Sequence, residues 1–286
     1  MNNKIKVSLR VLGYILVIHV LVSFFLVYRM INPERITTSR TPELFGLEYE
    51  DIEFESDDGT RLSGWYLDNE KDETVVVMHG YPADKGDMLS VITLLADDFN
   101  VLAFDFRGLG ESDGQTTLGS KETKDLDGAI DYLQDERGVE EVSLWGFSMG
   151  AGVALQVAPQ RDEVIAVVSD SSFSSMEKSL SELFPVPGLS KTMKPFISFW
   201  SRVLADVDPG EVSPHESVKE IEIPVYIIHA LEDPVIDVSH AKKIEEALGQ
   251  NAVRVEYIDS ESHGKLPGSI DRRLKDFLQK TNSSDR

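Results

Sequence analysis

A serine flanked by glycines is the residue in this chain best suited to nucleophilic chemistry. The sequence Gly-Phe-Ser-Met-Gly at 146–150 follows the apolar run 142–145 and precedes the helix-like run 151–157. A serine at such a strand–turn–helix junction has a strained backbone that pushes its hydroxyl clear of the sheet. The glycines let the strand and the helix approach each other closely. We therefore predict that Ser148 is a nucleophile.

A serine hydroxyl needs a base to take its proton, so the histidines are the next candidates. His263 is the best placed, because it lies in a polar loop directly after the predicted strand 252–258. His240 falls on a predicted surface helix, where we expect it to be solvated. We expect His229 to be packed at the end of a strand, and His215 follows a proline in a loop.

An acid must orient the histidine, and the chain offers two positions for it. Asp233 follows the predicted strand 224–229 and precedes a proline, which favours an extended turn. Its neighbour Glu232 is the residue most easily confused with it. Asp170 follows the strand 164–169, and we interpret it as a loop-capping residue. The acid would accept a hydrogen bond from the imidazole, fix its tautomer and stabilise its protonated form.

The chain order Ser148, Asp233, His263 resembles the α/β-hydrolase order rather than that of chymotrypsin or subtilisin. Residues 79–81, His-Gly-Tyr, look like the HG oxyanion motif that follows the third strand of this superfamily. Residues 105–112 resemble its D-x-R-G-x-G-x-S segment. The resemblance covers residues from about 48 to 280 and is nearest to the serine aminopeptidase-like and lysophospholipase-like branch.

This resemblance implies an oxyanion hole formed by the backbone amides of Tyr81 and Met149. The Met149 amide also lies near the predicted start of a helix, where amides favour a developing negative charge. By the same resemblance His79 is structural and not a base. The branch includes esterases, lipases and thioesterases, so it leaves the substrate open.

Short apolar runs alternate with helical stretches along most of the chain. Residues 52–56 and 62–67 predict an antiparallel hairpin with a glycine turn. Six further runs are predicted strands and five stretches are predicted helices: strands 74–78, 101–106, 142–145, 164–169, 224–229 and 252–258, and helices 88–97, 122–136, 151–158, 238–248 and 270–280. Continuous apolar strands between helices predict an α/β-hydrolase fold with a mostly parallel sheet covered on both faces.

Residues 170–220 interrupt this alternation and are too long for a simple crossover. Six apolar residues recur there with helical spacing: Met193, Phe196, Ile197, Trp200, Val203 and Leu204. One interpretation is a helical cap over the serine, with apolar side chains facing an acyl or aryl group. The other is an amphipathic helix packed on the sheet. In either case we expect a cap-like insertion.

The N-terminus predicts a transmembrane helix. Residues 11–28 contain no Asp, Glu, Lys or Arg, and at about 1.5 Å per residue their helix approaches the thickness of the hydrocarbon core. No cleavage site of small residues follows, so we expect an uncleaved signal anchor. Residues 1–10 would be a basic tail, 29–47 a linker and 48–286 the catalytic domain.

Arg29, Arg35 and Arg40 after residues 11–28 match the three positive residues before them, so the charge balance leaves the orientation open. A short basic tail usually stays in the cytoplasm, which predicts a single-pass protein of the cell membrane with an extracytoplasmic catalytic domain.

Composition narrows the functional classes. The absence of cysteine excludes disulfides and thiolate chemistry. A net charge of −22 argues against nucleic-acid binding. The sequence has neither metal-ligand spacing of the HExxH kind nor a phosphate-binding glycine loop, so we expect no metal and no cofactor.

The main prediction is a membrane-anchored serine hydrolase that cleaves a carboxylic ester, thioester or amide through an acyl-enzyme. Its partner would be a small-molecule or lipid-like acyl substrate. Two alternatives remain open. One is an acyltransferase, in which an alcohol or amine replaces water, and the other is a non-catalytic, hydrolase-like binding protein.

Overall fold

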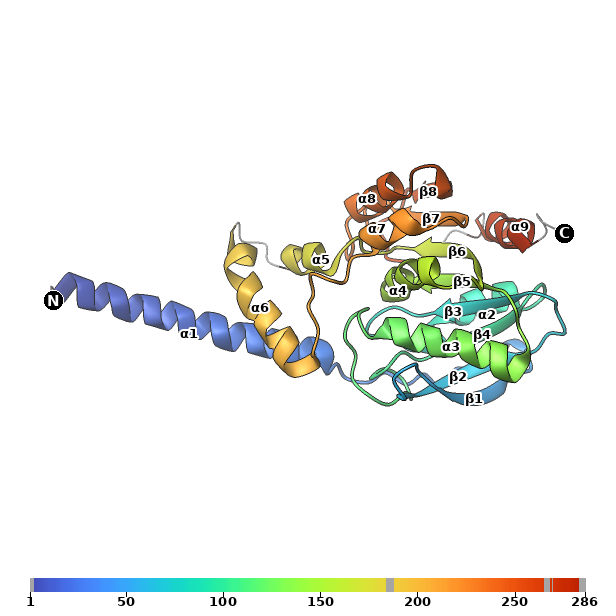
Figure 1. The fold of residues 1–286 in the computed structure, drawn as a ribbon, viewed down its shortest axis with the longest axis horizontal. Coiled ribbons are helices and arrows are strands. Elements are labelled where there is room, and N and C mark those ends of the chain that lie inside the picture. The colour runs from blue at the N-terminus through green and yellow to red at the C-terminus, as the bar shows by residue number, and fades with distance from the viewer. Residues whose placement is uncertain (1–2, 184–187, 265–267, 269, 283–286) are drawn as a thin grey trace.

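A single sheet of eight strands forms the centre of the molecule, in the order β1-β2-β4-β3-β5-β6-β7-β8 (Figure 1). The computed structural model describes residues 3–183, 188–264, 268 and 270–282. The strands are β1 (Glu50–Glu55), β2 (Arg61–Leu67), β3 (Thr74–Met78), β4 (Asn100–Phe104), β5 (Val142–Phe147), β6 (Val164–Asp170), β7 (Val225–Ala230) and β8 (Ala252–Ile258). β2 pairs antiparallel with β1 and β4, and the strands from β4 to β8 pair in parallel. The predicted, mostly parallel sheet is confirmed.

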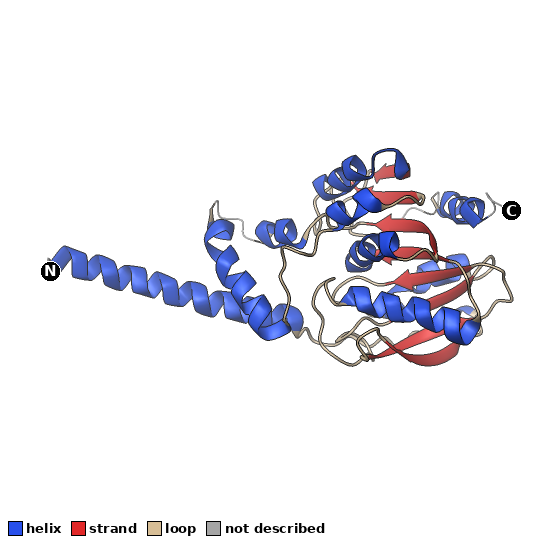
Figure 2. Cartoon of the chain, viewed as in Figure 1, coloured by secondary structure: helices blue, strands red, loops and turns tan. Residues whose placement is uncertain are grey.

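Helices cover both faces of this sheet (Figure 2). The residues of α3 (Glu122–Arg137), α4 (Met149–Val157) and α8 (Ser239–Leu248) pack in one apolar cluster. Those of α2 (Leu89–Leu95) and α9 (Asp271–Asn282) pack in another. Short 3-10 helices also occur along the described chain, at Pro42–Phe45, Lys85–Met88, Ala158–Gln160, Val218–Glu220 and Gly249–Asn251.

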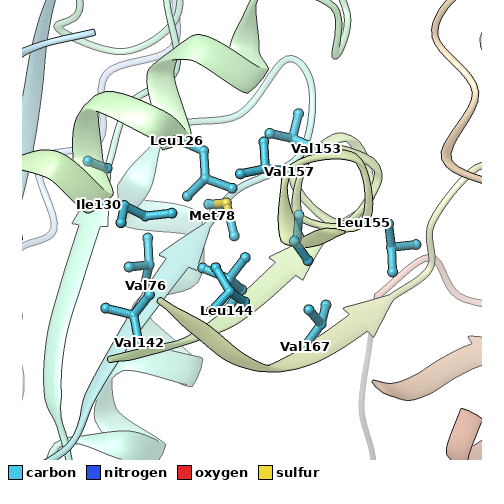
Figure 3. Packing of buried hydrophobic residues seen from close by; sticks show 14 of the residues in the cluster. Val76, Met78, Leu126, Ile130, Val142, Leu144, Val153, Leu155, Val157 and Val167 are labelled. Atoms are coloured by element: carbon cyan, nitrogen blue, oxygen red, sulfur yellow. The ribbon is translucent and has the colours of Figure 1, made fainter. Parts of the chain in front are cut away.

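The alternation of strand side chains explains the two clusters. In β3 every residue is buried, with Val76 and Met78 facing the α3 and α4 side and Val75 and Val77 facing the other side (Figure 3). Fully burying one such side chain stabilises the folded state by about 1.5–3 kcal/mol relative to leaving it exposed to water. A strand that is apolar on both faces is therefore stable only at the centre of a covered sheet, which is where β3 lies.

The predicted cap insertion contains α5 (Met176–Glu182), α6 (Leu189–Ala205) and α7 (Pro214–Ser217). The interpretation that the apolar stripe of α6 packs on the sheet is wrong. Its buried residues Met193 and Ile197 instead join Val27 and Ile31 of α1 (Asn3–Ile31) in a third cluster. In Figure 1 the lower end of α6 crosses α1 away from the sheet.

The N-terminal helix α1 has 29 residues, so it extends past the predicted span at both ends. Within the described residues it is the one helix long and apolar enough to cross a membrane. Most of its length projects from the rest of the molecule (Figure 1). The segment after it is held to the domain, because Arg35 donates to the Ser112 carbonyl across 2.6 Å and the Thr38 amide donates to Asp84 across 2.5 Å.

Candidate active site

Ser148 lies at the sharp turn between β5 and α4. Its backbone has φ 52° and ψ −109°, a region that non-glycine residues occupy only when the surrounding structure forces them into it. A Cβ atom added to Gly146 would lie 2.4 Å from the Ala151 nitrogen, and one added to Gly150 would lie 2.7 Å from the Met78 carbonyl oxygen. Both flanking positions therefore require glycine because backbone approaches them closely.

Asp233 and His263 are joined by a hydrogen bond, in which His263 Nδ1 donates to Asp233 Oδ2 across 2.7 Å. The Asp233 side chain is fully buried, and its Oδ1 accepts the amides of Val235 at 2.8 Å and Ile236 at 3.0 Å. Burial raises the pKa of Asp233, but the hydrogen bonds from His263 and the two amides outweigh it and hold the pKa below its ordinary value. An ionised Asp233 keeps the proton on Nδ1 and leaves Nε2 free to act as a base.

The His263 loop folds back over the residue that precedes Ser148. The rings of His263 and Phe147 pack with centroids 4.8 Å apart. A Cβ atom added to Gly264, which has φ 72°, would lie 2.0 Å from the Phe147 ring. In the described chain no hydrogen bond joins the Ser148 hydroxyl to His263. Such bonds are often long in the absence of substrate and tighten in its complex.

Asp170, the other candidate acid, lies at the end of β6 and makes no hydrogen bond to a histidine within the described part of the chain. Its carboxylate accepts the Ser171 hydroxyl across 2.8 Å, and its carbonyl accepts the Ser148 amide across 2.8 Å. Burial raises the pKa of Asp170 to about 7, and the charge of Asp233 acts in the same direction. The structure thus places Asp233, and not Asp170, against His263.

The prediction that His240 is solvated is wrong. Its side chain is fully buried, because α8 packs against the first residues of the cap as well as the sheet. Nδ1 accepts the Ser174 amide across 2.8 Å, and Nε2 donates to Glu182 of α5 across 3.0 Å. The 3.6-residue period showed that a helix is present but not that a second element covers its outer side.

The remaining histidines of the domain are bonded to backbone groups. The buried ring of His79 donates from Nδ1 to the Gly80 carbonyl at 2.7 Å and accepts the Phe106 amide at Nε2 across 3.0 Å. Burial lowers the pKa of His79, so it stays neutral. His229 donates to the Ile236 carbonyl across 2.8 Å, and His215 Nδ1 lies 2.7 Å from the Ser174 carbonyl oxygen.

The two predicted oxyanion donors lie beside Ser148. Met149 is the first residue of α4, where an amide has no acceptor within the helix. A Cβ atom added to Gly80 would lie 3.0 Å from the Ser148 Cβ, so the loop that carries Tyr81 packs against the serine turn. Tyr81, Met149 and Ser148 line one cavity of about 210 Å³.

The other walls of this cavity are mostly apolar. Met30 comes from α1, and the remaining side chains come from the cap and the surrounding loops: Leu118, Phe173, Met176, Leu180, Leu183, Val235 and Ile236, with Ser179. Sequence reasoning missed Met30, because nothing local to an apolar helix indicates that its end reaches a site so far along the chain. The cavity offers apolar space directly beside the candidate nucleophile.

A buried ion pair holds the loop that follows β3. Asp105 accepts the Lys85 amide and the Lys85 ammonium, each at 2.7 Å, and the Glu111 amide at 2.9 Å. The side chains of Asp105 and Lys85 are 1% and 4% exposed, so neither charge has water as an alternative partner. The 105–112 segment is therefore a scaffold for the loop that follows β3 and carries Tyr81. Among the described residues no group of three or more His, Cys, Asp or Glu is arranged to hold a metal ion.

Comparison with known proteins agrees with this architecture. The family model described as alpha/beta hydrolase fold matches residues 73–192. The esterase Pf2001 of Pyrococcus furiosus has the same fold with a TM-score of 0.72 and 27% identity, over 88% of this chain and 98% of that one. This chain has the α/β-hydrolase fold. The likeness to a solved esterase at this identity supports an esterase-like hydrolase.

Two curated relatives of this α/β-hydrolase are similar over part of their length. Protein YfhR of Escherichia coli (strain K12) is 28% identical over 206 residues, which is 68% of this chain and 66% of YfhR. Protein ABHD12B of Homo sapiens is 29% identical over 190 residues, which is 63% of this chain and 51% of ABHD12B. The chain thus spans about two thirds of YfhR and about half of ABHD12B.

Proposed function

We propose that this α/β-hydrolase is a serine hydrolase in which Ser148, His263 and Asp233 form the catalytic triad. The observation that carries the proposal is the 2.7 Å hydrogen bond from His263 to the buried Asp233, on a loop that packs against Phe147. This arrangement gives an oriented imidazole with a free Nε2 beside a serine held on a strained turn. The bond cleaved would be a carboxylic ester, thioester or amide.

The reaction follows from the position of each group. His263 Nε2 takes the proton of Ser148 Oγ, and Oγ attacks the substrate carbonyl carbon. The amides of Tyr81 and Met149 stabilise the resulting oxyanion. When the carbonyl re-forms, the leaving group departs with the proton held by His263. Water then gives a proton to His263 and attacks the acyl-enzyme. When this second intermediate collapses, the acid is released and His263 returns the proton to Ser148 Oγ.

The lining of the cavity supports an acyl group as the part of the substrate that binds beside Ser148. Leu180, Leu183 and Val235 offer apolar surface, and in the part of the chain that the structure describes no charged residue lines the cavity. A lipid-like acyl chain fits such a wall better than a charged peptide side chain, because the wall gives a charge no partner among the described residues.

The test of the nucleophile uses a fluorophosphonate probe on the full chain. We expect Ser148→Ala to abolish labelling and to lower ester turnover by several orders of magnitude. Ser179→Ala is the matched control, since Ser179 lines the same cavity, and it should label normally. Undiminished labelling of a folded Ser148→Ala variant would remove Ser148 from the mechanism. An unlabelled wild-type protein would favour a non-catalytic binding protein, and ester formation with an added alcohol would favour an acyltransferase.

We also propose that α1 is an uncleaved, single-pass membrane anchor with the catalytic domain outside the cytoplasm. The apolar length of α1 supports the anchor, and the basic residues Lys4, Lys6 and Arg10 at its N-terminal end, before the uncharged run 11–28, support this orientation. Protease added to intact spheroplasts should digest the catalytic domain. Digestion only after lysis would reverse the orientation, and a mature N-terminus beyond Tyr28 would contradict the anchor.

A further inference from the structure

The cap helix α6 packs directly against the apolar N-terminal helix. The Trp200 indole donates to the Val20 carbonyl of α1 across 3.1 Å, and the Trp200 and Phe24 rings meet edge to face at 5.0 Å. Thr192, one turn into α6, lies 3.1 Å from the His19 ring. The two helices therefore share an interface from residue 19 to the end of α1.

The position of these contacts along α1 sets the depth of α6. If residues 11–28 cross the hydrocarbon core, Val20 lies eight residues before Tyr28. At about 1.5 Å per residue this places Val20 roughly 12 Å below the boundary nearest the domain. An element that touches Val20 lies inside that leaflet and not above it.

The outer surface of α6 suits such a position. Phe199 and Val203, one turn apart, are 54% and 57% exposed. The polar side of the helix carries Lys191, Lys194 and Arg202 and lines a separate cavity of about 520 Å³ that also includes Glu177 and Asp208. One side of α6 can thus contact acyl chains while the other keeps its charges beside polar groups.

Charge also distinguishes these two helices from the rest of the protein. Together α1 and α6 contain seven Lys or Arg and no Asp or Glu, whereas the chain as a whole has 50 Asp or Glu and 28 Lys or Arg. Amphipathic helices with basic polar faces bind membrane interfaces, and anionic head groups attract their charges.

We propose that α6 is a second membrane element, whose Phe199 and Val203 insert among the acyl chains of the leaflet that α1 crosses. This inference rests on the proposed anchor. Met30, which lines the Ser148 cavity, lies only two residues beyond Tyr28, or about 3 Å along the helix. The cavity beside Ser148 is therefore at the bilayer surface, and an acyl ester dissolved in the leaflet reaches it without crossing bulk water.

The cysteine-free sequence allows a direct test with single nitroxide labels on the full chain in phosphatidylcholine–phosphatidylglycerol vesicles. Phe199→Cys and Val203→Cys should be relaxed several-fold more by oxygen than by a water-soluble nickel chelate. Leu16→Cys on α1 is the lipid reference, and Asp135→Cys on α3 is the water reference.

The outcomes separate α6 from the anchor. A water-like response at positions 199 and 203, with a lipid-like response at Leu16→Cys, would overturn the inference and leave the anchor intact. A water-like response at all of these positions would overturn both. Poor access of both reagents to positions 199 and 203 would indicate a covering protein and would also overturn the inference.

Trp200 provides an independent readout that needs no label. Trp65 and Trp145 are 4% and 0% exposed in the domain core, so Trp200 is the tryptophan nearest the lipid. Nitroxide-bearing lipids should quench part of the fluorescence, and Trp200→Phe should abolish that part. Equal quenching of the two proteins would contradict an α6 in the leaflet. Matching circular dichroism spectra would exclude misfolding as the cause of a difference.

Discussion

Two buried aspartates near His263 have opposite protonation preferences. Burial raises the pKa of Asp170 to about 7, whereas hydrogen bonds hold the pKa of Asp233 below its ordinary value. The difference arises because Asp233 receives two backbone amides and the imidazole, while Asp170 receives one hydroxyl. A carboxyl group that stabilises a protonated imidazole must be ionised at neutral pH. The hydrogen bonds to Asp233 favour its ionised form, so Asp233 suits that role better than Asp170.

We expect Asp233→Asn to reduce kcat about 10³–10⁴-fold, because an amide favours the wrong imidazole tautomer. Asp170→Asn should stay within about tenfold of wild type, since its carboxylate does not contact the ring. The measurement is steady-state hydrolysis of a p-nitrophenyl ester by variants of equal thermal stability. The reverse ranking would transfer the role to Asp170.

The raised pKa of Asp170 also predicts a pH dependence of stability. Between about pH 4 and pH 7 the folded chain keeps a proton on Asp170 that the unfolded chain has lost, so stability falls as the pH rises. Asp170→Asn removes this contribution. It should match wild type near pH 4 and exceed it at pH 8 by an amount on the order of 2–4 kcal/mol.

Thermal unfolding of the two proteins at pH 4.5 and pH 8 would measure this difference. Asp135→Asn, a change at an exposed position on α3, is the control and should show no such dependence. An Asp170→Asn variant that is less stable than wild type at pH 8 would show that the ionised carboxylate is required.

The sequence predicted Ser148, Asp233 and His263 because each follows a strand in a recognisable local pattern. It did not predict the pKa of Asp170 or the burial of His240. Both depend on neighbours distant in the chain: the burial of Asp170 and the charge of Asp233 for the first, Ser174 and Glu182 for the second. The triad itself stays a prediction until Ser148 is tested.

At the scale of elements, the turn between β5 and α4 depends on close approach of backbone. We expect Gly150→Ala to destabilise the protein by about 1–3 kcal/mol and to lower activity, because its Cβ atom would lie within 2.8 Å of two carbonyl oxygens. Gly210→Ala is the matched control, since its nearest neighbour would be 3.4 Å away. Melting temperatures and ester turnover of both variants provide the measurement. Equal effects would show that the turn has room to adjust.

All eight strands were predicted because apolar runs and glycine turns are local signals. The packing partner of α6 was not, because helical periodicity shows that one side is apolar but not which element covers it. One sequence signal could have indicated that α1 is the packing partner of α6. The complete absence of Asp and Glu in both helices sets them apart in a strongly acidic chain.

At the scale of the whole molecule, α1 is part of the hydrolase and not only a tether. It contributes Met30 to the cavity and Val27 and Ile31 to the cap cluster. The predicted linker is also bonded to the domain through Arg35 and Thr38. The sequence alone predicts a soluble, active chain after truncation to Leu47, because every candidate catalytic group lies beyond that point.

The structure changes that expectation. A chain beginning at Leu47 should still react with a fluorophosphonate, but it exposes Met193 and Ile197 and should aggregate without detergent. Loss of the Met30 wall should lower kcat/KM for a long-chain ester about tenfold more than for an acetate ester. Met30→Ala in the full chain should reproduce part of this selectivity change. A truncated chain that is monomeric and equally active on both esters would contradict a role for α1 in the site.

The separation of basic helices from an acidic body gives the protein a large electric dipole, which the proposed anchor would direct along the membrane normal. An anionic leaflet attracts the end that contains α1 and α6 and repels the rest. In physiological salt the repulsion decays over about 8 Å, so only the acidic surface nearest the lipid feels it. At low ionic strength repulsion should hold the acidic domain away from the bilayer surface, and added salt should allow the domain to tilt toward that surface. Förster resonance energy transfer from a donor fluorophore on the domain to an acceptor in the bilayer should then increase with salt in anionic vesicles and stay constant in neutral ones.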